Sequence, residues 1–285
     1  YILASQRNNS SLHTKQSEMS IVKQFKGNKI LSSAEFVSLF KKYDSDGSGF
    51  IESGELDSFL KDLCEELGTE NQLKCDIKDL KTLVLTKYDA NADGKLSMDE
   101  MSKILPTEKN FLMSFRKNVK LTSVDFMEIW FHYDLDKSGY LEGSEIEGFI
   151  YDFLKKAESD VSPTKIADFK ESILGAIDTD NDGKISLTEL AELLPAGENF
   201  FKKYENKHRL DQGDFNEIFD HYDKDKSGLI EEQELLALLK DIMEREGAIS
   251  LADLESFKVE ILKIVDKNND GKVSRDELAL LLSAQ

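Results

Sequence analysis

The chain has 285 residues, of which 40% are hydrophobic and 33% are charged, and its formal net charge is −19. This strong negative charge argues against nucleic acid or an anionic membrane surface as the main partner. The sequence contains no run of about 18 apolar residues, so we expect no transmembrane segment. Its two cysteines, Cys64 and Cys75, are too few for a disulfide framework in a chain of this length, and we expect reduced thiols.

Residues 1–30 are polar and carry a net positive charge. Their one acidic side chain is Glu18, and their basic side chains are Arg7, Lys15, Lys23, Lys26 and Lys29. We expect a flexible basic tail, because such a segment has too little apolar surface to form a core. The alternative is a basic anchor for an acidic surface, which could belong to the same protein.

The first predicted helix follows Ser32 and leads into Asp44. Its apolar residues have the i, i+3, i+4, i+7 spacing of one helix face, and they are Phe36, Leu39, Phe40 and Tyr43. Ser32, with Glu35 three residues later, is a capping-box pattern for the start of this helix. Two further helices start in the same way, with the capping pairs Thr122 and Asp125, and Asp211 and Asp214.

A twelve-residue loop with Asp first, Gly sixth and Glu twelfth follows the first helix, and it occurs six times in the chain. The loops occupy residues 44–55, 89–100, 134–145, 178–189, 223–234 and 266–277. This is the pattern of calcium loops of the EF-hand type, in which oxygen ligands come from positions 1, 3, 5, 7, 9 and 12 and Gly permits a sharp turn. The sequence therefore predicts a calcium-binding protein.

Each loop offers side-chain oxygens at positions 1, 3 and 5, a backbone carbonyl at position 7 and a bidentate carboxylate at position 12. The predicted ligand residues are Asp44, Asp46, Ser48, Phe50, Glu55, Asp89, Asn91, Asp93, Lys95, Glu100, Asp134, Asp136, Ser138, Tyr140, Glu145, Asp178, Asp180, Asp182, Lys184, Glu189, Asp223, Asp225, Ser227, Leu229, Glu234, Asp266, Asn268, Asp270, Lys272 and Glu277. Position 9 would contribute through a water molecule. The second and sixth loops have three acidic side chains at these positions and the others have four, so we expect those two sites to be the weakest. Magnesium is a possible competitor, although its octahedral preference makes it the poorer fit.

The six loops alternate between two kinds, which predicts three pairs of unlike hands. Odd loops have Ser at position 5 and Glu at position 9, whereas even loops have Asp at position 5 and Ser at position 9. Position 8 is apolar throughout, so paired loops can join through a short antiparallel ladder. Pro106 and Pro195 end the helices that follow the second and fourth loops. We place the pairs at residues 31–106, 107–195 and 196–285 and expect them to pack as one globular unit.

The predicted fold class is therefore all-α, with six helix–loop–helix units arranged as three pairs and short β-ladders between paired loops. Two linkers share the pattern Leu-Pro-x-x-x-Asn-Phe, at residues 105–111 and 194–200, and residues 126–134 read Phe-x-x-Ile-Trp-x-x-Tyr-Asp. With these motifs, residues 30–285 resemble the hexa-EF-hand proteins calbindin, calretinin and secretagogin. The resemblance implies a compact helical protein, cytosolic calcium buffering and, in some members, calcium-dependent partner binding. Six intact loops point to an invertebrate or divergent member.

Three functions are compatible with this pattern, and none of them is enzymatic, because no nucleophile is paired with a base and no phosphate-binding loop is present. The first is a monomeric cytosolic calcium buffer, with diffusion into the nucleus possible. The second is a sensor that binds target proteins through an exposed apolar groove, although the six methionines are scattered. The third is a luminal protein of the secretory pathway, which would have a signal peptide and a C-terminal retention signal, whereas this sequence ends in Leu-Leu-Ser-Ala-Gln.

Overall fold

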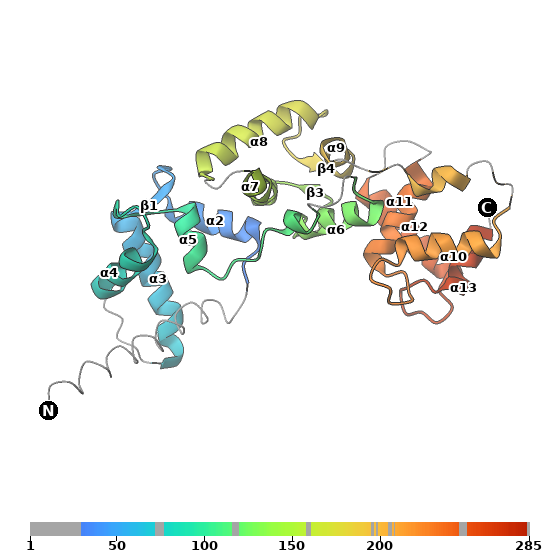
Figure 1. Cartoon of the computed structure of the whole chain (residues 1–285), viewed down its shortest axis with the longest axis horizontal. Coiled ribbons are helices and arrows are strands. Elements are labelled where there is room, and N and C mark those ends of the chain that lie inside the picture. The colour runs from blue at the N-terminus through green and yellow to red at the C-terminus, as the bar shows by residue number, and fades with distance from the viewer. Residues whose placement is uncertain are drawn as a thin grey trace. The chain divides into compact units, whose positions relative to one another are not determined.

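The computed structural model describes residues 30–71, 77–115, 120–157, 161–194, 197, 199–204, 207, 209–244 and 250–283 (Figure 1). Apart from Ile30, the predicted basic tail lies outside these residues. The chain divides into two compact units, one of Tyr1–Phe111 with Glu147–Glu171 and one of Leu112–Ile146 with Ser172–Gln285. The division passes through the middle predicted pair, so the pair boundaries and their packing into one globule stay predictions.

Helix–loop–helix units account for both compact units, as the sequence predicts. The first unit contains α2 (Ser33–Tyr43), β1 (Phe50–Glu52), α3 (Ser53–Asn71), α4 (Ile77–Tyr88), β2 (Lys95–Ser97), α5 (Met98–Ile104), most of α7 (Ser144–Ala157) and the first part of α8 (Pro163–Ile177). The second unit contains most of the 3-10 helix η2 (Phe111–Phe115), α6 (Ser123–Tyr133), β3 (Tyr140–Leu141), β4 (Ile185–Ser186), α9 (Leu187–Leu193), the 3-10 helix η3 (Phe200–Tyr204), α10 (Gln212–Tyr222), α11 (Glu232–Met243), α12 (Leu251–Val265) and α13 (Arg275–Ser283). The predicted all-α fold class is confirmed.

Short antiparallel ladders join the loops in pairs, and in each pair the two residues at position 8 lie opposite each other. Strand β1 pairs with β2, with Ile51 opposite Leu96, and β3 pairs with β4, with Leu141 opposite Ile185. In the third pair a single bridge joins Ile230 and Val273 through two N–H···O bonds of 2.9 and 3.0 Å. All six of these side chains are fully buried, so the ladders are held by apolar packing as well as by hydrogen bonds.

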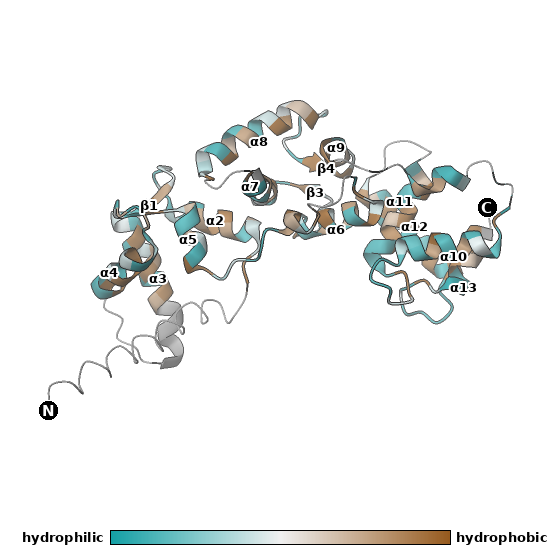
Figure 2. Cartoon of the chain, viewed as in Figure 1, coloured by the Kyte–Doolittle hydropathy of each residue, from teal (hydrophilic) through white to brown (hydrophobic). Residues whose placement is uncertain are grey.

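The helix starts predicted from the capping boxes are confirmed. Ser32, Thr122 and Asp211 are the N-caps of α2, α6 and α10, and in each the acid three residues later bonds back to the cap backbone. Helix α5 ends at Ile104, just before Pro106, while Pro195 lies outside the described residues. Figure 2 shows the resulting amphipathic helices, which carry brown hydrophobic and teal hydrophilic residues on different faces. Among the described residues, no helix is long and apolar enough to cross a membrane.

Cys64 is disulfide-bonded, so the expectation of a reduced thiol is wrong at this position. The other cysteine in the chain, Cys75, lies outside the described residues. The count of cysteines excludes a disulfide framework, but it does not exclude a single disulfide bond. Cys64 lies within α3, and α3 packs on α4.

In the first unit, α7 crosses α2 with Gly148 at the contact point. A Cβ atom at Gly148 would lie 2.4 Å from the backbone nitrogen of Ala34 and 2.6 Å from its Cα, so only glycine fits there. Close by, the Lys41 Nζ donates to Glu147 Oε1 at 2.7 Å, and the rings of Phe36 and Tyr151 lie 5.4 Å apart. The first hand is thus packed tightly against the helix that leaves the third loop.

In the second unit, α6 packs along α11, and these two helices form the most extensive helix contact of the described residues (Figure 1). Buried Asp241 of α11 joins the two helices, because its carboxylate accepts from Ser123 Oγ and from Tyr222 Oη, both at 2.6 Å. Burial raises the pKa of Asp241, and both hydrogen bonds act in the opposite direction.

A second polar contact links α6 to the fifth loop. Lys224 Nζ lies 2.6 Å from Asp125 Oδ1, whose side chain is buried, and 2.7 Å from Glu128 Oε2. Burial alone would raise the pKa of Asp125, but the bonds from Lys224 and Thr122 hold it below its ordinary value. The ionised carboxylate therefore stabilises the folded state.

Replacing Asp125 with Asn is expected to lower the free energy of unfolding at pH 7 by about 1–3 kcal/mol, since Lys224 loses its buried partner. Because the folded pKa of Asp125 is depressed, its contribution is complete above the unfolded pKa of about 4 and disappears as the pH falls through the folded value. Urea unfolding of the metal-free protein from pH 7 to pH 3 measures this difference. Glu128→Gln, at the more exposed partner, is the control and should cost less than about 1 kcal/mol. A loss for Asp125→Asn that did not shrink on acidification would contradict the assignment.

Candidate metal centres

The six predicted loops adopt one common geometry, built outward from position 1. The incoming helix extends to this position, so that the Asp backbone N–H still bonds to the carbonyl four residues earlier. One carboxylate oxygen of the Asp then accepts from the N–H of the Gly at position 6. The distances are 3.0 Å for Asp44, 2.8 Å for Asp89, 3.2 Å for Asp134, 3.0 Å for Asp178, 3.1 Å for Asp223 and 2.9 Å for Asp266. The glycines have φ between 75° and 85°, which is the turn that the sequence pattern predicts.

The Glu at position 12 is fixed by the start of the outgoing helix. One of its oxygens accepts from the backbone N–H of position 2, at distances of 2.7 to 3.0 Å in the six loops. The other accepts from the N–H of position 9, at distances of 2.9 to 3.3 Å. Position 12 is therefore also the third helical residue of a capping arrangement, which directs its carboxylate back across the loop toward position 1.

Positions 3, 5 and 7 complete the ring of oxygens. The side chain at position 3 accepts from the N–H of position 5 in every loop, at 2.8 to 3.2 Å. In odd loops the Ser hydroxyl at position 5 donates to the carbonyl of position 7, as between Ser48 and Phe50 at 3.2 Å. In even loops the Asp at position 5 instead accepts from the N–H of the Lys at position 7. The predicted oxygens of these positions are thus next to one another in space.

Four loops bring three carboxylates together at positions 1, 3 and 12. The groups are Asp44, Asp46 and Glu55; Asp134, Asp136 and Glu145; Asp178, Asp180 and Glu189; and Asp223, Asp225 and Glu234, each with one ligand oxygen per residue within 4.8 Å of the others. The second and sixth loops have Asn at position 3, so only positions 1 and 12 of this group are acidic there, and their third acidic side chain is the Asp at position 5. There Asn91 and Asn268 donate their amides to Asp93 and Asp270 at 2.9 Å.

The loops fit a hard dication. Oδ1 of Asp44 and Oδ1 of Asp223 are buried and have no hydrogen-bond partner, although both residues accept at their other oxygen. Burial raises the pKa of Asp44, and it also raises the pKa values of Glu145 and Glu234. Buried carboxylates in such groups favour a cation with high charge, and an all-oxygen donor set is the one that calcium prefers.

One recurring contact was missed by the sequence reasoning. In each pair, the Lys at position 7 of the even loop forms an ion pair across the ladder with the Glu at position 9 of the odd loop. The pairs are Lys95 with Glu52 at 2.5 Å, Lys184 with Glu142 at 2.6 Å, and Lys272 with Glu231 at 2.5 Å. The signal was present in the alternation of loop types, because Lys and Glu occur in those positions in all three pairs. The alternation thus partly reflects pairing between loops.

The position 9 residues of the even loops also have a structural role. The hydroxyls of Ser97, Ser186 and Ser274 accept from the N–H of the Glu at position 12 and donate to its carboxylate. These serines cap the outgoing helices, which the sequence reasoning did not predict because it considered position 9 only as a water-mediated ligand.

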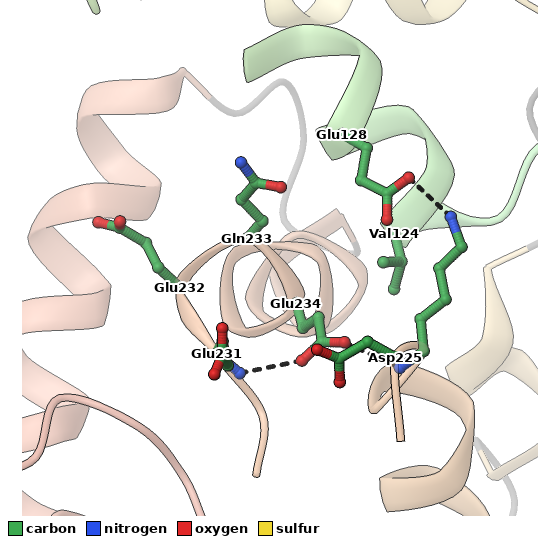
Figure 3. Close-up of a pocket in the computed structure, with 8 residues that line it drawn as sticks. Val124, Glu128, Asp225, Glu231, Glu232, Gln233 and Glu234 are labelled. Atoms are coloured by element: carbon green, nitrogen blue, oxygen red, sulfur yellow. Dashed lines mark hydrogen bonds and ion pairs between the residues drawn. The ribbon is translucent and has the colours of Figure 1, made fainter. Parts of the chain in front are cut away.

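The fifth loop borders a pocket of about 610 Å³ between α6 and α11. Glu128 of α6 lies 2.7 Å from Lys224, and Figure 3 shows Glu234 beside Asp225. Asp225 and Glu234, two predicted ligands of the fifth loop, line this pocket. The remaining lining residues are Val124, Glu231, Glu232 and Gln233.

The fluorescence of Trp130 should report on calcium binding by the third loop. It is the only tryptophan in the chain, it is fully buried, and its carbonyl accepts from the N–H of Asp134 at 2.9 Å. Burial raises the pKa of Asp134, while the N–H groups of Gly139 and Ser138 and the Trp130 indole act in the opposite direction.

Calcium addition is therefore expected to change the tryptophan emission of the protein. Glu145→Gln should remove most of this change, because it removes the position 12 ligand of the third loop. Glu277→Gln, the same substitution in another pair, should leave it in place. Calcium titration of the unaltered protein and of the two variants, followed by tryptophan fluorescence, measures this. An emission change that survives Glu145→Gln but is lost with Glu277→Gln would show that Trp130 does not report on the third loop.

Comparison with known proteins gives a consistent result. The family description "EF-hand domain pair" matches residues 34–105, 124–194 and 214–283. Calretinin of Gallus gallus is 41% identical over 258 residues, which cover 90% of this chain and 94% of calretinin. Calbindin-32 of Drosophila melanogaster is 37% identical over 266 residues, covering 89% and 86% of the two chains. Calbindin of Gallus gallus is 37% identical over 256 residues, covering 90% and 95%.

Proposed function

The chain belongs to the calbindin and calretinin family of EF-hand calcium-binding proteins, and from this premise we propose that it is a calcium buffer that holds up to six Ca²⁺ ions. It is not an enzyme. The observation that supports a buffer is that all six loops have the same hydrogen-bonded geometry and a full set of predicted oxygen ligands. Six similar loops in one chain raise the number of Ca²⁺ ions that each molecule can bind, which is the property that a buffer needs.

The stoichiometry tests the proposal. Calorimetric calcium titration of the metal-free protein should give six ions per chain, and a parallel titration in the presence of magnesium should show competition at some sites without loss of capacity. A stoichiometry of four or fewer would overturn the six-site proposal and would identify the incompetent loops through the matching Glu→Gln variants. Sedimentation at the same concentrations tests the proposed monomer.

The second and sixth loops are proposed as the weakest sites. They have one acidic side chain fewer, and the amides of Asn91 and Asn268 already occupy one carboxylate oxygen of the neighbouring Asp. Ligand charge is one determinant of calcium affinity in such loops. Titration of Glu100→Gln and Glu277→Gln should remove low-affinity sites, whereas Glu189→Gln should remove a tighter one. Equal losses from all three variants would contradict this order.

A sensor function is the second candidate, and exposed apolar side chains favour it. In the second unit, Val259 and Ile264 of α12 are 47% and 73% exposed, and Leu280 of α13 is 42% exposed. A sensor exposes further apolar surface when calcium binds. A fluorescent dye for apolar surface, measured with calcium and with a chelator, distinguishes the two: a large increase with calcium supports target binding, and no change supports the buffer.

The proposed location is the cytosol, with access to the nucleus by diffusion. The disulfide at Cys64 favours the luminal alternative, because oxidising compartments preserve such bonds. Fractionation of cells that express the native protein, with thiol alkylation before lysis, tests both points at once. Alkylated cysteines in the cytosolic fraction support the proposal, and an oxidised protein in the membrane-enclosed fraction supports the alternative.

A further inference from the structure

Two linkers make the same contact with the hand that follows them. Asn110 Nδ2 donates to the backbone carbonyl of Asp152 in α7 at 2.6 Å, and Asn199 Nδ2 donates to the carbonyl of Asp241 in α11, also at 2.6 Å. Each Asn is followed directly by a 3-10 helix, η2 or η3. Both receiving aspartates are 1% exposed. Each linker is therefore fastened to the outgoing helix of an odd hand, inside its own compact unit.

Aromatic residues strengthen the second of these contacts. The ring of Phe200 lies 6.0 Å from that of Tyr222, and the ring of Phe201 also lies 6.0 Å from it. Tyr222 in turn bonds to the carboxylate of Asp241. The linker thus covers the end of α10 as well as α11.

A third copy of this linker precedes the first hand in the sequence. Residues 20–31 read SIVKQFKGNKIL, residues 110–121 read NFLMSFRKNVKL, and residues 199–210 read NFFKKYENKHRL. The three segments align without a gap, and each ends at a Leu directly before a helix N-cap. Their apolar positions coincide, with Ile21, Val22 and Phe25 matching Phe111, Leu112 and Phe115 in one copy and Phe200, Phe201 and Tyr204 in the other.

The structure supports this alignment at the last residue of the first two segments, Leu31 and Leu121. The carbonyl of Leu31 accepts from the N–H of Glu108 at 2.9 Å, and the carbonyl of Leu121 accepts from the N–H of Gly197 at 2.7 Å. Glu108 and Gly197 occupy the same position in the two Leu-Pro linkers. Both leucines are buried. Leu31 is therefore held as its counterpart in the next repeat is held.

The matching surface on the first hand is more exposed than in the other two. Asp62 of α3 corresponds to Asp152 and Asp241, yet its side chain is 46% exposed. It keeps the equivalent bond, since Tyr43 Oη donates to it at 2.7 Å. Leu39 of α2 is only partly buried, whereas its counterparts Ile129 and Ile218 are 1% and 0% exposed.

We propose that residues 20–30 dock on this surface, formed by Leu39, Tyr43 and Asp62, as a third linker of the same kind. Ser20 takes the place of Asn110 and Asn199, and its hydroxyl can donate one hydrogen bond to the carbonyl of Asp62. Ile21 and Val22 take the places of Phe200 and Phe201 beside the tyrosine ring. Asp62 already forms an ion pair with Lys42 at 3.1 Å, and Lys23, Lys26 and Lys29, with no acidic residue among 20–30, would add to the positive charge around its carboxylate.

Hydrogen exchange of the full chain, followed by mass spectrometry, tests this docking. Peptides covering residues 20–30 should exchange at least about tenfold more slowly than their intrinsic rate, because docking protects backbone amides. The double variant Ile21→Ser with Phe25→Ser should remove that protection and speed exchange in the peptide that contains Asp62. The matched control is Ile2→Ser with Leu3→Ser, which changes two apolar residues outside the segment and should alter neither peptide.

Two results would overturn the proposal. One is exchange of residues 20–30 at the intrinsic rate in the unaltered protein, which needs no variant to interpret. The other is protection that depends on protein concentration and appears together with a dimer in sedimentation, because the segment would then dock on a second copy of the chain.

Discussion

Replacing Glu189 with Gln is expected to abolish calcium binding by the fourth loop at ordinary calcium concentrations while leaving the loop and its outgoing helix folded. We expect an affinity loss of about 100-fold or more, which corresponds to about 2.7 kcal/mol. The effect should be local, because Glu189 belongs to one group of three carboxylates with Asp178 and Asp180.

The structure separates two functions of this side chain. As a ligand, Glu189 would offer two charged oxygens to a dication, and Gln offers one neutral oxygen. As a structural residue, Glu189 accepts from Thr179 N–H at 2.9 Å and from Ser186 N–H at 2.9 Å, and its backbone is capped by Ser186. Gln is also accepted in capping boxes, so the variant should keep most of the second function and lose the first.

Calorimetric titration should therefore show one ion fewer per chain, with an unchanged circular dichroism spectrum for the metal-free protein. The matched control is Glu192→Gln, which makes the same charge change on the exposed face of the same helix and should preserve all sites. If Glu192→Gln reduced binding as much as Glu189→Gln, net charge rather than ligation would explain the loss.

The parts of the molecule that depend on near neighbours in sequence were predictable. Loop register, capping boxes and the apolar position 8 each involve residues within twelve positions of one another, and the structure has them as expected. The pairing of Ile51 with Leu96 was predictable as well, although they lie in different loops, because an apolar side chain in an otherwise polar loop needs a partner and the next loop has one at the same position.

Contacts between distant segments were not predictable from these patterns. The ion pair of Lys224 with Asp125 joins residues 99 positions apart, and the sequence pattern marked Asp125 only as a capping residue of its own helix. The Lys184 and Glu142 pair follows from the register of the ladder, which fixes the neighbours only once the strands are paired. The disulfide at Cys64 was likewise not predictable, because the number of cysteines alone does not show whether a single bond forms.

Replacing Gly148 with Ala is expected to destabilise the protein by about 2–3 kcal/mol, although alanine is the better helix former by about 1 kcal/mol. The new methyl group would lie 2.4 Å from the Ala34 nitrogen and 2.6 Å from its Cα, distances that real Cβ atoms essentially never show. These are backbone atoms of α2, so no side-chain rotation relieves the overlap, and α2 and α7 must separate. Separation would open the buried contact between Phe36 and Tyr151.

Gly175 of α8 provides the matched control, because a Cβ atom there meets nothing within 4 Å. Gly175→Ala should raise the free energy of unfolding by about 0.5–1 kcal/mol, since it keeps the gain in helix propensity without an overlap. The same substitution in two helices is thus expected to have opposite signs in chemical denaturation. Adding Ala34→Gly to Gly148→Ala should give little rescue, because it removes the Cβ contact at 2.8 Å but neither of the two closer backbone contacts. A Gly148→Ala variant as stable as the Gly175→Ala variant would show that α7 does not cross α2 at this distance.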